Sequence, residues 1–126
     1  MQENSQRILR EQLDGFREYL ESTLQLEKKR LDESLRRSAE SKITAIRERT
    51  ENSIQRTVEQ YDRAIARIEG YATDPSLAIL AESARESARR ALDTTIAFHR
   101  QLAETAIGAI QKILQDHHAR SGSVKI

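Results

Sequence analysis

The sequence predicts an all-α protein, a long antiparallel two-helix hairpin of the hendecad coiled-coil type, and it predicts that this hairpin self-associates. Three observations support the prediction: few turn-forming residues, one strong turn signal, and apolar residues that recur every 11 positions. The 126 residues include only 4 Gly and 1 Pro, whereas a turn-rich β fold needs many of both. We therefore expect one helical domain over residues 1–126.

The first expected helix covers about residues 4–70. Its interior lacks Pro and contains one early glycine, Gly15, which costs about 1 kcal/mol relative to Ala. Eleven residues over three turns is about 3.67 per turn, which favours straight or gently right-handed packing over a left-handed heptad coil. One apolar row is Leu13, Leu24, Leu35, Ile46, Thr57 and Ile68. The other begins as Leu9, Leu20 and Leu31. Its spacing shifts by one residue near 38–43, and it then continues as Ile43, Ile54 and Ile65.

The turn is expected at residues 70–75. Gly70 suits the end of a helix, and Pro75 suits the first position of the next one, where its missing N–H is no loss. Asp74, directly before the proline, can accept hydrogen bonds from the free N–H groups at the start of that helix. These three residues together predict that the chain reverses here.

The second expected helix covers about residues 75–119 and is followed by a flexible tail over 120–126. It keeps the 11-residue spacing with smaller side chains, which would accept the bulky Leu and Ile side chains of the first helix. Its rows are Leu77, Ala88, His99 and Ile110, then Ala81, Leu92, Ala103 and Leu114, and then Ala84, Thr95, Ala106 and His117.

The two expected helices differ in length, roughly 100 Å against 67 Å at 1.5 Å per residue. The second helix would reach back only to about residue 26, which leaves residues 4–25 without a partner in the same chain. Apolar surface of this size is typically covered, so the sequence predicts a homo-oligomer, a dimer or larger. The candidate self-association residues are Leu9, Leu13, Phe16, Leu20 and Leu24. In the alternative, the first helix breaks near 38–41 and a three-helix bundle forms.

The sequence predicts no enzyme and no catalytic, cofactor-binding or metal-binding residues. There is no Cys, and the three histidines, His99, His117 and His118, are not spaced to converge on a metal. The chain has neither a Gly-rich phosphate loop nor a Gly-x-Ser-x-Gly motif. We therefore expect a non-enzymatic structural or adaptor protein that mediates protein–protein interaction or assembly with an unidentified partner.

Positive and negative charges are nearly balanced, with 21 Lys and Arg against 20 Asp and Glu. The strongest candidate for an anion-binding stripe is Arg49, Arg56 and Arg63, which repeat every seven residues, followed by Arg67. A nucleic-acid-binding hairpin is thus an alternative. It is not favoured, because neighbouring acids dilute the stripe and no segment concentrates positive charge.

Two further alternatives concern surfaces and assemblies. Eleven-residue repeats also occur in amphipathic helices that coat lipid or hydrophobic granules, although here the apolar face is narrow and Trp is absent. Residues 74–80, DPSLAIL, resemble the Asn/Asp-Pro turn and following apolar residues of type III secretion needle and rod subunits. This resemblance covers about ten residues, and the long charged first helix departs from it. It implies a helical-hairpin subunit of a secretion or phage-type assembly.

The N-terminal residues lack the basic and apolar regions of a secretory signal, and the longest apolar run, residues 77–81, is too short to span a bilayer. These features predict a cytoplasmic protein. Export without a leader remains open as an alternative.

Overall fold

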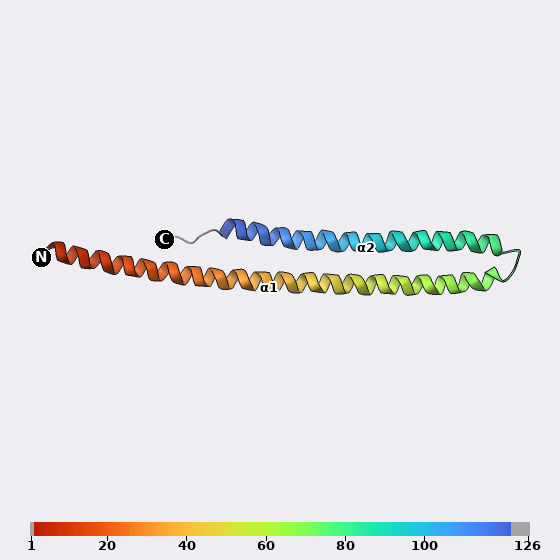
Figure 1. Ribbon diagram of the computed structural model, residues 1–126, viewed down its shortest axis with the longest axis horizontal. Helices are drawn as coiled ribbons and strands as arrows, with labels where there is room; N and C mark the ends of the chain where they lie inside the picture. The colour runs from red at the N-terminus through yellow and green to blue at the C-terminus, as the bar shows by residue number, and fades with distance from the viewer. Residues whose placement is uncertain (1, 122–126) are drawn as a thin grey trace. The chain divides into compact units, whose positions relative to one another are not determined.

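The computed structural model describes residues 2–121, with side chains described for residues 2–120. It contains two helices, α1 (Gln2–Ala72) and α2 (Ala78–Ser121), joined by a turn over residues 73–77 (Figure 1). Residues 2–121 contain no strand, so the prediction of an all-α chain with two long helices is confirmed. Helix α2 begins three residues later than expected and extends two residues further. The rest of the expected tail, 122–126, lies outside the described residues.

Helix α1 is continuous through residues 38–43, where the alternative of a three-helix bundle required a break. That alternative is wrong. The segment contains neither Gly nor Pro, and Ala39 is buried, so the backbone has no local reason to leave the helix.

The chain divides into two compact units, and each contains a segment of both helices. Unit 1 comprises Met1–Ser41 and Gln111–Ile126, and unit 2 comprises Lys42–Ile110. Unit 2 therefore holds the turn together with the C-terminal part of α1 and most of α2.

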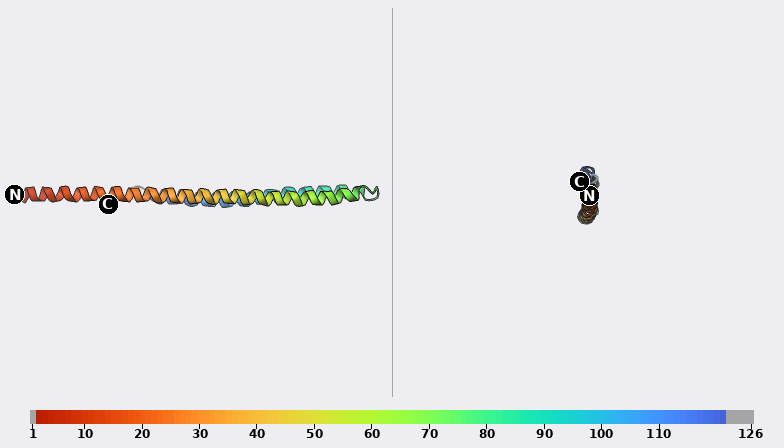
Figure 2. Two further views of the ribbon diagram at one scale, coloured as in Figure 1. Left: turned by 90° about the horizontal axis from the view of Figure 1, so that it is seen from below. Right: turned by 90° about the vertical axis from the view of Figure 1, so that its left-hand side faces the viewer.

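Unit 2 is an antiparallel helical hairpin: its two helical segments lie side by side in Figure 1 and overlap one another in the left view of Figure 2. The predicted rows form its interface, because every row position in this unit except Ala84 is half-buried or buried. The most buried side chains are Ile54, with 8% of its surface exposed, and Ala81, with 4%. Large aliphatic side chains of α1 thus pack on small ones of α2, as expected.

An ion pair between the helices shows their register near the turn. Nε of Arg85 lies 2.9 Å from Oε1 of Glu69, although its N–H is not directed at that oxygen and forms no hydrogen bond. Both side chains are substantially exposed, so the pair contributes little to stability. The pair shows that Glu69 of α1 lies level with Arg85 of α2.

The turn is held by Asp74, as the sequence predicted. Its Oδ1 accepts hydrogen bonds from the Ser76 backbone N–H at 3.0 Å and from the Ser76 hydroxyl at 2.8 Å. These bonds, that of the hydroxyl first, hold the pKa of the Asp74 carboxyl below its ordinary value of 3.8. The Asp74 carbonyl also accepts from Leu77 N–H at 3.0 Å, and Leu77 accepts from Ala81 N–H at 2.9 Å. Helix α2 is therefore started by a capped turn.

The predicted rows behave differently in unit 1. Leu31 and Leu35 are exposed, whereas Lys28, Asp32 and Glu33 are half-buried. The expectation that these leucines pack against the second helix is therefore wrong. The rows preceding residues 38–43 lie along a side of α1 that α2 does not cover, although the same spacing faces α2 in unit 2.

Candidate self-association surface

The five predicted self-association residues, Leu9, Leu13, Phe16, Leu20 and Leu24, form what we call the N-terminal apolar face. Every described side chain from residue 2 to residue 19 is exposed, including Phe16 at 60%. Leu24 is also exposed, and Leu20 is half-buried. The face is thus present and largely open to solvent, as an association surface requires.

The length of α2 explains why this face is open. His117 of α2 contacts Asp32 of α1, and α2 ends four residues later at Ser121. Because two antiparallel helices have the same rise per residue, α2 ends level with about residue 28 of α1. Residues 2–27 therefore have no described part of α2 beside them.

Charge is confined to one side of this N-terminal segment. At 100° per residue, the five apolar residues fall within an arc of about 80°, and the uncharged Gln12, Tyr19 and Thr23 adjoin it. All charged residues from 2 to 24 lie in a separate arc of about 120°: Glu3, Arg7, Arg10, Glu11, Asp14, Arg17, Glu18 and Glu21. The segment is thus amphipathic from Leu9 to Leu24.

The apolar face continues further than the sequence predicted. Leu31 lies 11 residues after Leu20, Leu35 lies 11 residues after Leu24, and both are exposed. The sequence contained this signal, since both leucines belong to the predicted rows. It was missed because every leucine level with α2 was assigned to the contact between the helices.

The predicted basic stripe of Arg49, Arg56, Arg63 and Arg67 lies on unit 2, and all four side chains are exposed. Nε of Arg56 donates a hydrogen bond to the Asn52 carbonyl at 3.4 Å. None of the four forms an ion pair with another described residue. Lys42, exposed and seven residues before Arg49, extends the stripe to five cations.

A second exposed apolar surface lies on α2 and was not predicted. Leu80, Ala91 and Leu102 are spaced by 11 residues, and Phe98 lies beside them on the same flank. Leu80 is 66% exposed and Phe98 is 59% exposed. We call Leu80, Ala91, Phe98 and Leu102 the α2 stripe. Its spacing was readable from the sequence, but the predicted rows used the neighbouring positions.

Two hollows show that the α2 stripe and the basic stripe border the same side of unit 2. Gln60, between Arg56 and Arg63, lines one hollow together with Ala91 of the α2 stripe. Tyr71, four residues after Arg67, lines another together with Leu80. Since residues three or four apart share a helix face, one side of unit 2 presents an apolar stripe beside a cationic one.

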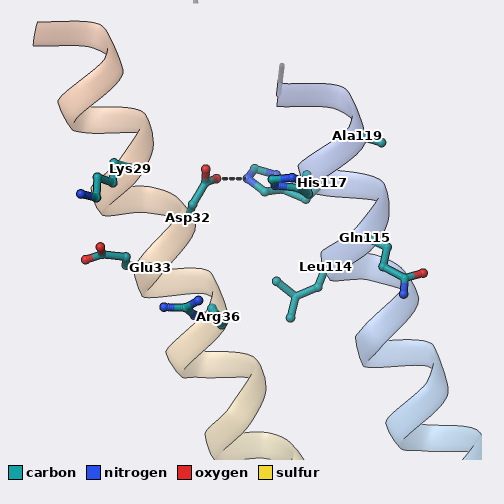
Figure 3. Close-up of a pocket in the computed structure, with 9 residues that line it drawn as sticks. Lys29, Asp32, Glu33, Arg36, Leu114, Gln115, His117 and Ala119 are labelled. Atoms are coloured by element: carbon teal, nitrogen blue, oxygen red, sulfur yellow. Dashed lines mark hydrogen bonds and ion pairs between the residues drawn. The ribbon is translucent and has the colours of Figure 1, made fainter. Parts of the chain in front are cut away.

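Unit 1 holds a third hollow, lined on α1 by Lys29, Asp32, Glu33 and Arg36 (Figure 3). Asp32 and His117 point toward each other, and His117 Nε2 lies 3.1 Å from Asp32 Oδ1. Leu114 points into the space between the helices, whereas Lys29 and Glu33 extend away from α2. One carboxylate and one imidazole, both about one-third exposed, form a polar bridge between the helices.

Within residues 2–121, no group of three or more His, Cys, Asp or Glu side chains is arranged to hold a metal ion. Neither described helix combines the length and apolar character needed to cross a membrane. Comparisons of the chain with models of protein families, with curated proteins and with solved structures found no match. The geometry of the two units is therefore the basis for any functional conclusion.

Proposed function

We propose that this protein is a non-enzymatic structural or adaptor hairpin that self-associates through the N-terminal apolar face and so mediates protein–protein assembly. One observation carries the proposal: Leu9, Leu13, Phe16 and Leu24 are exposed together on a segment that α2 does not reach. Burying such side chains is worth about 1.5–3 kcal/mol each, so a second copy that covers them gains substantial free energy.

Helix stability supports the same conclusion. Most helical stability in proteins comes from packing of an amphipathic face, and the exposed side chains of residues 2–19 have no such packing against the described part of the chain. Association would stabilise this helix through packing of its amphipathic face. The spacing by 11 residues suits long, straight helix–helix packing of the hendecad type.

The decisive measurement is absolute mass by light scattering on a sizing column, over a wide range of protein concentration. We expect the wild-type chain to reach at least twice its 14.4 kDa mass. The double variant Leu13→Glu, Phe16→Glu places two carboxylates on the face and should return the mass to that of one chain. Its circular dichroism should still show a high helix content and a cooperative thermal transition.

The matched control is Ile79→Glu, compared with Phe16→Glu alone. Ile79 is 82% exposed but lies on α2, away from the N-terminal apolar face, so its substitution should leave the mass unchanged. A wild-type mass of 14.4 kDa at all concentrations would contradict self-association. A double variant that keeps the wild-type mass would contradict the assignment to this face.

A further inference from the structure

We propose that the N-terminal apolar face of one copy docks on the side of unit 2 that carries the α2 stripe and the basic stripe in a second copy. This inference rests on the proposed self-association and adds which surface receives the face. The simplest alternative is that two N-terminal faces pair with each other, leaving the α2 stripe uncovered.

The first argument is that both surfaces are uncovered and both are apolar. The N-terminal face has no described part of α2 beside it, and the α2 stripe exposes Leu80, Phe98 and Leu102. Pairing one with the other covers both surfaces at once. Pairing two N-terminal faces would leave the large apolar side chains of the stripe in water, which is unfavourable.

The second argument is spacing. Leu13 and Leu24 are 11 residues apart, and so are Ala91 and Leu102. Because all helices rise equally per residue, a pair spaced by 11 on one helix can lie level with a pair spaced by 11 on the other, in either direction. The hollow lined by Ala88, Ala91 and Gln60 gives a large side chain a place between the two helices of unit 2.

The third argument is charge. Residues 2–26 carry five acids, Glu3, Glu11, Asp14, Glu18 and Glu21, against three arginines, Arg7, Arg10 and Arg17. The receiving side of unit 2 carries the five cations of the basic stripe, Lys42, Arg49, Arg56, Arg63 and Arg67. The net charge of −2 over residues 2–26, five acids against three arginines, thus favours this side over a second N-terminal segment at low salt, with the charged arc beside the docked apolar face and not within it.

A complementation experiment distinguishes this docking from pairing of N-terminal faces. One variant, Leu13→Glu, Phe16→Glu, has a defective N-terminal face and an intact receiving side. The other, Phe98→Glu, Leu102→Glu, has the reverse. Both should be monomers by light scattering, with the dissociation constant raised at least about 100-fold. An equimolar mixture should form a complex of the two, since it contains one intact face and one intact receiving side.

Two other outcomes overturn the inference and leave the proposed function standing, and a third overturns both. If Phe98→Glu, Leu102→Glu keeps the wild-type mass while the N-terminal variant is monomeric, the N-terminal faces pair with each other. If the α2 variant keeps that mass but loses flotation with vesicles containing phosphatidylserine, the receiving side binds a lipid surface. If the wild-type chain is a monomer at every protein concentration, the proposed function and this inference are both contradicted.

A charge variant provides a test that does not depend on the apolar substitutions being tolerated. Arg56→Glu, Arg63→Glu changes only exposed side chains that form no ion pair with a described residue, and should raise the dissociation constant about tenfold at low salt. The matched control Arg47→Glu, Arg100→Glu changes exposed cations of unit 2 outside the two stripes, which likewise form no ion pair with a described residue, and should have a much smaller effect. Equal effects of the two variants would count against the specific contact.

Discussion

Oδ1 of Asp32 lies 3.1 Å from Nε2 of His117, a contact between residues 85 positions apart in the chain. It joins α1 to α2 within unit 1, one helical turn before α2 ends at Ser121. Beyond this point α1 has no described part of α2 beside it. The contact therefore marks where the packed part of α1 gives way to the N-terminal apolar face.

We expect this bridge to contribute little to stability, because both side chains are about one-third exposed. A double-mutant cycle with Asp32→Asn and His117→Gln should give a coupling free energy of at most about 1 kcal/mol in urea unfolding. A coupling of several kcal/mol would mean that the bridge, rather than apolar packing, holds α2 to α1 in unit 1.

Asp74 should make stability depend on pH in the acid range. Its pKa is lowered in the folded state by the Ser76 hydrogen bonds, so its contribution is present above the unfolded value of 3.8 and is lost as the pH falls through the lower folded pKa. The difference in melting temperature between wild type and Asp74→Asn should thus shrink between pH 6 and pH 2. A difference that stays constant with pH would show that the carboxylate charge is not what stabilises the turn.

Ile54 should be among the residues of unit 2 most sensitive to truncation. It is 8% exposed, so Ile54→Ala should lower the free energy of unfolding by about 2–4 kcal/mol. The matched control Ile79→Ala removes the same atoms from a side chain that is 82% exposed and should change it by less than about 0.5 kcal/mol. Similar losses in denaturant titrations of the two variants would contradict the packing of unit 2.

Hydrogen exchange should divide α1 into two parts. In solutions dilute enough to contain monomers, the amides of residues 2–19 should exchange far faster than those of residues 43–68, because their side chains make no burying contacts. Raising the protein concentration should then protect residues 2–19 selectively. Strong protection of these amides in the monomer would be inconsistent with an exposed segment.

Much of the fold could be predicted from the sequence because the spacing of apolar residues has a direct structural meaning. Ile43, Ile54 and Ile65 recur every 11 residues and all pack against α2 in unit 2. The turn was equally clear, because Asp74 and Pro75 leave few conformations open to the backbone. Helix α2 nevertheless begins at Ala78 and not at Pro75, because the capped turn occupies residues 73–77.

Other features of the site could not be derived from spacing alone. A row of residues defines one side of a helix but does not say which neighbour covers it, so Leu31 and Leu35 were assigned to the wrong environment. Likewise, the sequence places Arg63 and Ala91 on the flanks of two helices. Only the packed hairpin shows that these flanks border the same side of unit 2.

The core of this chain also has a mechanical consequence. Among the described residues, no polar or charged side chain is buried, and the buried ones are Ala39, Ile54 and Ala81, each with a few per cent of its surface exposed. The apolar rows repeat every 11 residues, so sliding α2 along α1 by 11 residues, about 16 Å, would bring each row position level with the next one and would lose only the exposed Glu69–Arg85 and Asp32–His117 contacts. The short turn over residues 73–77 is what forbids this slide. If that turn were lengthened with flexible residues, the hairpin would be able to adopt more than one register of α2 on α1.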